Sequence, residues 1–220
     1  KILQRFFKTG VGEYGEGDVF WGVTMPEVRS VVKQFLDLPI GEIRQLVRSR
    51  VHEQRMVGLL LLVHRAKSDL EHTYVEYMKS LRYVNNWDLV DATCEYIVGA
   101  WSHRHNDMRP MIALARSKNL WERRIGVVST FAYTKKGDDR PMYLIADIVL
   151  HDEQDLIQKA VGWMLREAGK RVSEGRLRKY LDRHAQHMPR TTLRYAIERL
   201  PKPVQKAYLR SEGKSARIHR

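Results

Sequence analysis

The sequence contains a single cysteine, Cys94, and no long apolar run. One cysteine excludes an intrachain disulfide framework and a zinc site of paired cysteines, which fits a reducing compartment. The longest apolar run, Leu59 to Val63, is far shorter than the roughly 20 residues that span a bilayer. We therefore expect no membrane segment, and no apolar stretch typical of a signal peptide follows Lys1 to Phe7.

Metal and nucleotide signatures are also missing. The nine histidines are scattered without a His-Glu-x-x-His pair, so no metal ion or other cofactor is expected. The glycine-rich stretch from Gly10 to Gly17 lacks the Gly-Lys-Ser/Thr ending of a phosphate-binding P-loop. We expect an ordinary loop there, with Tyr14 at its tip.

Basic residues are what the chain has in excess. Lys and Arg number 39 against 26 Asp and Glu, which gives a formal net charge of +13 over 220 residues. A domain this basic usually binds a polyanion, although a merely basic cytosolic protein has the same composition. A hydrophobic fraction of 43% and a charged fraction of 30% indicate a folded chain.

Helical periodicity dominates the sequence, and the alternation typical of strands is absent. The breaks between helical segments are short and contain proline or glycine, as at Pro39, Gly137, Pro189 and Pro201. No linker is long enough to separate two domains. We expect one all-α domain over residues 1–210, followed by a basic, frayed tail over residues 211–220.

A loose repeat runs through this helical pattern. Five segments resemble the start of one kind of helix, and each carries a charged residue at intervals of 36, 33, 35 and 35 positions: Arg55, Asp91, Arg124, Lys159 and Arg194. Helix pairs of this length build α-solenoids, whose second helices line a concave surface. We predict a HEAT-like helical-repeat solenoid with a concave basic groove.

The helix predicted over residues 155–170 has an unusual tryptophan outside its apolar stripe. Trp163 lies opposite the stripe, on the side of the helix that also carries Lys159, Arg166 and Lys170. One interpretation is an aromatic surface for a sugar or base, with the cations on phosphates. The other is that Trp163 packs against a neighbouring helix.

The helix predicted from residue 86 onward places a carboxylate near an aromatic ring. Helical spacing relates Trp87, Asp91, Cys94 and Val98, so Trp87 and Asp91 stand one turn apart on one face. A carboxylate at the edge of an apolar arc loses solvation and is a candidate functional group. The alternative is a helix-start aspartate, a role that Asp88 on a more exposed face fits better.

A third helix, predicted over residues 121–134, carries Arg124 in the middle of its apolar arc. An arginine in that position needs a carboxylate or a phosphate, and Asp91 is the nearest candidate by the repeat. The alternative is a structural ion pair between adjacent repeats.

Four strings in these segments carry a family resemblance. They are the glycine-rich string at 7–20, Asn-Asn-Trp-Asp-Leu-Val-Asp at 85–91, Asn-Leu-Trp-Glu-Arg-Arg at 119–124 and Lys-Ala-Val-Gly-Trp-Met-Leu-Arg-Glu at 159–167. Over nearly its whole length the chain resembles the DNA alkylation repair enzymes of the AlkD type. That family has a HEAT-like solenoid with double-stranded DNA in its concave groove.

The resemblance implies roles for individual residues. Trp87 and Trp163 match two aromatic residues that pack on the deoxyribose of the lesion, Asp91 matches the catalytic carboxylate, and Arg124 matches the arginine beside it. Further DNA contacts are expected from the loop and the other cations: Tyr14, Arg55, Lys159, Arg166, Lys170 and Arg194.

The implied reaction is hydrolysis of the N-glycosidic bond of a cationic purine of the 3-methyladenine or 7-methylguanine type. Such an enzyme would be a monofunctional DNA glycosylase of base excision repair, since no lysine stands out as a Schiff-base nucleophile. We expect a monomer that acts in the cytoplasm, on the nucleoid DNA of a bacterial-type cell. The alternative is a non-catalytic HEAT-like module that binds DNA structures or a protein.

Overall fold

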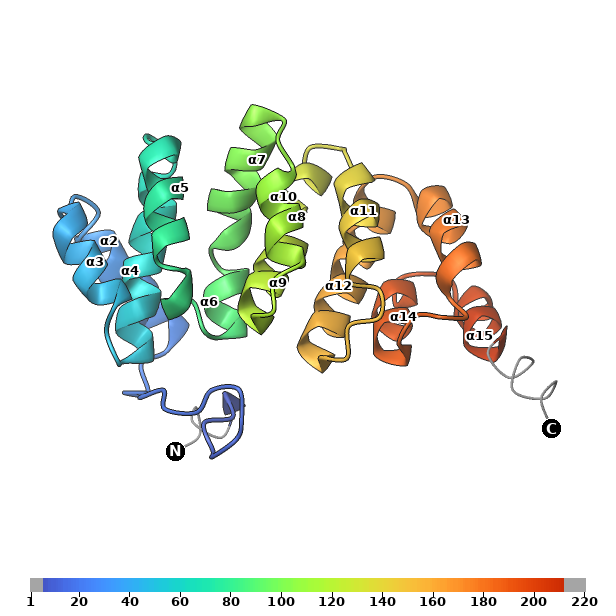
Figure 1. Ribbon diagram of the computed structural model, residues 1–220, viewed down its shortest axis with the longest axis horizontal. Helices are drawn as coiled ribbons and strands as arrows, with labels where there is room; N and C mark the ends of the chain where they lie inside the picture. Colours follow the sequence, from blue (N-terminus) through green and yellow to red (C-terminus); the bar gives the residue numbers. More distant parts are fainter. Residues whose placement is uncertain (1–5, 212–220) are drawn as a thin grey trace. The chain divides into compact units, whose positions relative to one another are not determined.

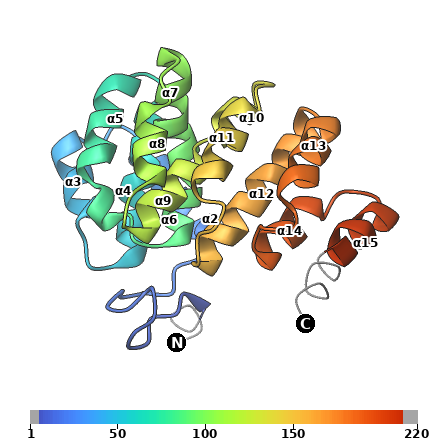
Figure 2. The same ribbon diagram turned by 45° about the vertical axis from the view of Figure 1, so that its right-hand side comes forward.

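The computed structural model describes residues 6–211, which form helices joined by turns (Figures 1 and 2). Within residues 6–211, β-type pairing is limited to one isolated bridge, between Val19 and Val51. The all-α fold class predicted from the sequence is therefore confirmed. Residues 212–220 of the expected tail lie outside the described residues.

The chain divides into two compact units, residues 1–104 and 105–220. The expected single domain over residues 1–210 and the concave groove stay predictions. The helices of the first unit follow in chain order: α2 (Met25–Gln34), α3 (Ile40–Val47), α4 (His52–Arg65), α5 (Leu70–Lys79), the 3₁₀ turn η1 (Leu81–Tyr83), α6 (Trp87–Asp91), the π-helical turn η2 (Glu95–Gly99) and α7 (Ala100–His105).

Helix α4 is the central element of the first unit, because α2, α3, α5 and α6 all pack against it. Its apolar run is buried from Leu59 to Leu62, so nearly every side of the helix is covered. Gly58 lets α3 approach closely, since a Cβ at this position would lie 2.9 Å from the backbone nitrogen of Val47. This packing brings the first residues of α4 next to α6.

The second unit has the same alternation of helices. Its elements are α8 (Arg109–Ala115), α9 (Leu120–Val128), α10 (Phe131–Thr134), α11 (Arg140–Ile148), α12 (Asp155–Arg171), α13 (Glu174–His184), α14 (Arg190–Ile197) and α15 (Lys202–Ser211). Helix α12 packs against α9, α11, α13 and α14 (Figure 1). Its buried stripe includes Ile157, Val161 and Leu165, as its periodicity predicts.

The predicted repeat starts coincide with helix starts. Helices α4, α6, α9, α12 and α14 begin at His52, Trp87, Leu120, Asp155 and Arg190. Each charged residue of the repeat therefore lies in the first four or five residues of its helix. The helical repeat read from the sequence is confirmed at the level of its elements.

Two predicted helices are interrupted. The helix expected over residues 121–134 ends at Val128, and after Ser129 and Thr130 the short α10 begins. The hydroxyl of Thr130 donates to the carbonyl of Val127 at 2.7 Å, a side-chain bond that competes with regular helix geometry. The helix expected from residue 86 breaks in the same way and is described with the site.

The contact between α12 and α14 depends on Gly162. A Cβ at this position would lie 2.4 Å from the Cβ of Tyr195 and 2.6 Å from the carbonyl oxygen of Thr192. We expect Gly162→Ala to lower the free energy of unfolding by about 1–3 kcal/mol, because the two helices must separate. Urea unfolding of the purified protein measures this change.

The matched control is Gly175→Ala in α13. Its new Cβ would meet the Ser173 hydroxyl oxygen at an ordinary 3.8 Å, and alanine favours a helix over glycine by up to about 1 kcal/mol. Equal destabilisation by both substitutions would contradict the close approach of α12 and α14.

Candidate functional site

Helix α6 carries the predicted pair of Trp87 and Asp91. The side chain of Asn86 caps the helix by accepting from the Trp87 backbone N–H at 2.8 Å. Buried Leu89 and Val90 anchor α6 in the first unit, while Trp87 and Asp91 are partly exposed on the same side. The expected one-turn relation of the indole and the carboxylate therefore holds.

The helix ends directly after Asp91, contrary to the regular helix predicted through Val98. The hydroxyl of Thr93 donates to the Leu89 carbonyl at 2.5 Å and lies 2.9 Å from the hydroxyl oxygen of Tyr77. The π-helical turn η2 follows at Glu95–Gly99. Such turns add a residue to the helical repeat and are frequent at functional sites. Burial raises the pKa of Tyr77 well above its ordinary value.

Trp87 is one end of a stack of aromatic rings. The ring centroid of Phe7 lies 5.4 Å from that of Trp87 at an interplanar angle of 28°, and Phe20 stacks on Phe7 at 4.9 Å. His52 in turn stacks on Phe20 at 4.4 Å. Phe6, which is 60% exposed, meets Trp87 edge-on at 5.8 Å. The N-terminal segment therefore covers one side of the indole.

A buried cluster of charged groups lies at the far end of this stack. The two ring nitrogens of His52 lie 3.2 Å from an Asp18 carboxylate oxygen and 2.8 Å from an Asp88 oxygen. Asp18 also accepts from Arg55 at 2.7 Å and from the Asn85 amide at 3.1 Å. Asp88 lies in the first turn of α6 and also accepts from the Leu89 backbone N–H at 2.8 Å, so it has the helix-start role expected for it, with a side chain that is 15% exposed.

The cluster shifts the pKa values of its members. Burial alone would raise the pKa of Asp18, but its hydrogen bond with His52 and the charge of Arg55 outweigh burial and lower it. Burial alone would lower the pKa of His52, but its hydrogen bonds to Asp18 and Asp88 outweigh burial and raise it. Both shifts favour the charged forms.

Arg55 is not placed for the DNA contact expected of it. It is 4% exposed, and its guanidinium donates to Asp18 and to the carbonyl oxygens of Ser49 and Arg50. Its position in the repeat was recognised correctly, but the guanidinium serves as an internal partner of a buried carboxylate. The buried guanidinium is therefore not accessible to a DNA phosphate in this structure.

The glycine-rich segment forms a series of hydrogen-bonded turns. The Gly15 N–H donates to the Lys8 carbonyl at 3.0 Å, and the Glu13 side chain accepts from the Gly10 N–H at 2.9 Å. Tyr14 is partly exposed, with the Lys8 ammonium 5.9 Å from its ring centroid. An aromatic ring beside a cation is compatible with the DNA contact expected at Tyr14.

In the second unit, Arg124 lies within α9 as its periodicity predicts. It is 6% exposed, and its guanidinium donates to the Leu156 carbonyl at the start of α12. The neighbouring Arg123 pairs with Asp152 at 2.6 Å. Asn119 caps the start of α9, and its side chain accepts from the Trp121 backbone N–H. Arg124 thus contributes to the packing of α9 on α12.

Trp163 on α12 combines the two interpretations left open by the sequence. It is partly exposed, and its ring centroid lies 6.2 Å from that of Phe131. Phe131 is also approached by the cations of Lys135 and Arg171, at 4.6 Å and 5.0 Å from its centroid. Trp163 therefore packs on a neighbouring helix with part of its surface and exposes the rest.

The predicted cations of the second unit differ in their surroundings. Lys159 pairs with Asp155 at 2.6 Å, and Arg166 is 18% exposed and pairs with Glu198. Lys170 and Arg194 are exposed. Lys170 and Arg194 are thus the most accessible of the four to a phosphate.

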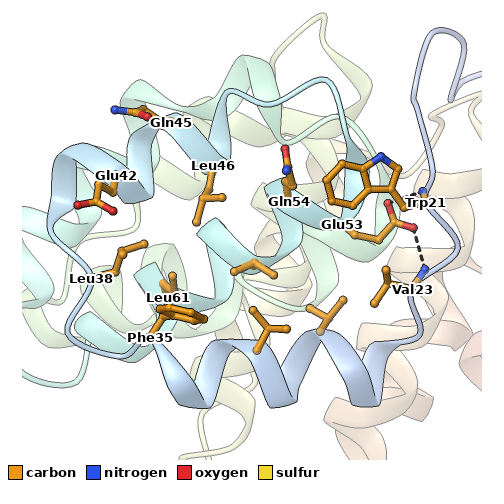
Figure 3. A pocket seen from close by; sticks show the side chains of 13 residues that line it. Trp21, Val23, Phe35, Leu38, Glu42, Gln45, Leu46, Glu53, Gln54 and Leu61 are labelled. Carbon is orange, nitrogen blue, oxygen red and sulfur yellow. Dashed lines mark hydrogen bonds between the residues drawn. The ribbon is translucent and has the colours of Figure 1, made fainter.

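The first unit also has a hollow of about 570 Å³ with apolar walls, between α2, α3 and α4 (Figure 3). Trp21 and Phe35 lie on its walls, and Glu53 accepts from the backbone N–H groups of Trp21, Gly22 and Val23. Over residues 6–211, no group of side chains suits a metal ion and no helix is long and apolar enough to cross a membrane.

Sequence reasoning missed the residues that surround Trp87. Phe7 and Phe20 fall within the glycine-rich string, and His52 opens a recognised repeat, but no regular spacing links them. Their contacts join segments distant in sequence, as from Asp18 to Asn85. No sequence motif or regular spacing predicts that His52 is buried between Asp18 and Asp88.

Repeated helix pairs with aromatic and charged side chains near the helix starts define a helical-repeat protein. A model of the DNA alkylation repair enzyme family matches residues 1–200, so the chain belongs to that family. It is also similar to a solved structure described as a predicted DNA alkylation repair enzyme from Enterococcus faecalis. That match has 19% identity and a TM-score of 0.74, and it covers 91% of this chain and 94% of the other.

At this identity the structural likeness shows the fold alone. A comparison with curated proteins gave no match. Membership of the family establishes a role in the repair of alkylation damage, with DNA as the partner.

The internal role of Arg55 predicts a large effect on stability. Arg55→Met would leave the Asp18 carboxylate buried without its closest cationic partner, and we expect the free energy of unfolding to fall by about 3–5 kcal/mol. The exposed Arg194→Met should change it by less than about 0.5 kcal/mol. Urea unfolding of both variants decides the matter, and equal stabilities would contradict the assignment of Arg55.

Proposed function

We propose that this protein is a monofunctional DNA glycosylase that hydrolyses the N-glycosidic bond of alkylated, cationic purines in double-stranded DNA. The observation that carries the proposal is the geometry of α6, which sets an indole and a carboxylate one turn apart and partly exposed, in a member of a DNA alkylation repair family. Lesions of the 3-methyladenine or 7-methylguanine type are the proposed substrates.

The chemistry of these substrates fits the side chains present. Alkylation gives the base a positive charge and makes it a good leaving group, so protonation by a general acid is not needed. The sugar becomes cationic as the bond breaks, and Asp91 would stabilise that charge and position the attacking water. The faces of Trp87 and Trp163 would add attraction to the sugar.

The stabilisation that Asp91 would give to the cationic sugar can be expressed as a rate acceleration. A carboxylate about 4 Å from a unit charge, at an effective dielectric constant near 20, contributes about 4 kcal/mol. That corresponds to roughly a thousandfold in rate. Asp91 alone would therefore account for a substantial acceleration of a reaction whose leaving group is already activated.

The remaining proposed contacts bind the DNA backbone. Lys170 and Arg194 are the exposed cations, and we propose that they contact phosphates together with Lys159, Arg166 and Tyr14. Arg124 donates to the Leu156 carbonyl, and we propose that its charge supports the site from within α9. A single chain supplies all of these groups, so a monomer suffices.

The first test replaces the proposed catalytic carboxylate. Asp91→Asn keeps the shape of the side chain but removes its charge, so base release from methylated DNA should fall roughly a thousandfold while DNA affinity is retained. Asp37→Asn, at an exposed carboxylate of the same unit, should release base at the wild-type rate. Unchanged release by Asp91→Asn would refute the assigned role.

A second test addresses the phosphate contacts through salt. Each phosphate contact lowers the slope of log affinity against log salt by about 0.9, because a counterion is released. Because each substitution removes one contact, Lys170→Ala and Arg194→Ala should each make the slope less negative by about that amount. Arg140→Ala removes the same charge from an 84% exposed site on α11 and should leave the slope unchanged.

The alternative function is a non-catalytic module that binds DNA structures or a protein. It is favoured by the general use of helical repeats as binding scaffolds. The two functions are distinguished by the wild-type protein itself: salt-dependent DNA binding with no release of methylated base would support the module and reject the glycosylase.

A further inference from the structure

His52 is buried between the two elements that shape the proposed site. It is 3% exposed at the start of α4, and its two ring nitrogens face carboxylates from opposite directions. Asp18 belongs to the N-terminal segment, and Asp88 belongs to α6, directly after Trp87. The imidazole thus joins α4, the N-terminal segment and α6 at one point.

The protonation of the ring decides whether both contacts are hydrogen bonds. A carboxylate only accepts, and a neutral imidazole has a single N–H to donate. Only the imidazolium can donate to Asp18 and Asp88 together. In the neutral form with the proton toward Asp88, the other nitrogen would present its lone pair to the Asp18 oxygen at 3.2 Å.

The charges that face His52 favour the protonated form in sum, because two carboxylates act for it and one guanidinium acts against it. The N-terminal segment contributes the carboxylate of Asp18, α6 contributes that of Asp88, and α4 contributes the guanidinium of Arg55, 3.4 Å from the ring nitrogen. Asn85 adds a neutral amide on Asp18. With a cationic His52 the cluster is neutral, whereas with a neutral ring it carries a buried negative charge, which is costly.

A second path links the imidazole to Trp87. The ring of His52 stacks on Phe20 at 4.4 Å and lies 5.2 Å from Phe7, which in turn stacks on Trp87 at 5.4 Å. His52 therefore touches α6 by a charged bond to Asp88 and approaches its indole through Phe7. Both routes end within one helical turn of Asp91.

We propose that His52, as an imidazolium bonded to Asp18 and Asp88, is a positioning residue that fixes the first turn of α6 and so the orientation of Trp87 and Asp91. It touches no substrate. The catalytic part of this inference rests on the proposed glycosylase activity, whereas the positioning of Trp87 does not. The raised pKa of His52 agrees with it, because the contribution of the charged form persists at low pH and is lost as pH rises through that pKa.

The direct test is an NMR titration of the wild-type protein. We expect correlation spectra of the imidazole to show both ring nitrogens of His52 protonated at pH 6, with a midpoint above the ordinary value of about 6.5. The indole N–H resonance of Trp87, assigned with Trp87→Phe, should shift with the same midpoint. The proposal is overturned if the His52 ring carries only one proton at pH 6. It is also overturned if the Trp87 indole resonance does not shift as His52 titrates.

The second arm measures single-turnover base release from methylated DNA against pH, corrected for release without enzyme. Wild type should lose rate as pH rises through the His52 midpoint, and His52→Gln should be about 10-fold to 100-fold slower at neutral pH without that alkaline decline. His72→Gln alters an exposed histidine–aspartate pair on α5 and should keep the wild-type profile. An alkaline decline that survives in His52→Gln rejects the catalytic part.

The proposed glycosylase activity and the proposed positioning role of His52 can each fail without the other. A wild-type protein that releases no base refutes the glycosylase, but the NMR titration still decides whether His52 positions Trp87. If His52→Gln does not fold by circular dichroism, Asp88→Asn replaces it. That variant should lower the His52 midpoint and slow base release at neutral pH, and an unchanged midpoint rejects the imidazolium bond.

Discussion

The burial of apolar stripes along the central helices is the constraint on which the rest of the structure depends. Helix α4 in the first unit and α12 in the second are covered by their neighbours on several sides, so few positions on them can carry polar groups without a partner. Arg55 illustrates the consequence: it lies at a repeated position, and its charge is stabilised by Asp18 rather than by solvent. The same packing brings α6 against α4 and thereby sets where Trp87 and Asp91 emerge.

Much of this organisation could be predicted from the sequence because it is periodic. Helix starts at His52, Trp87 and Asp155 follow from apolar spacing and from the repeat of similar helix starts, and the one-turn relation of Trp87 and Asp91 needs only helical geometry. Exposure was harder to predict. Repeat position alone does not separate the buried Arg55 from the exposed Arg194, since the difference depends on which neighbouring segment provides a carboxylate.

The interruptions of the helices were beyond sequence reasoning for a related reason. Thr93 and Thr130 satisfy backbone carbonyls with their hydroxyls, and such local bonds compete only weakly with a regular helix. The outcome is decided by tertiary contacts, as when Tyr77 meets the Thr93 hydroxyl from α5. Apolar periodicity therefore predicts the existence of a helix better than the residue at which the helix is interrupted.

The bonds of Asp18 also have a consequence for the order of folding. Helix pairs close over short stretches of chain, whereas the bond from Asn85 to Asp18 spans 67 residues and that from His52 spans 34. Long loops cost more entropy to close, so contacts of this kind form after local ones. The entropy cost of ordering the N-terminal segment against α6 therefore falls on these few long-range bonds, not on the local helix pairs.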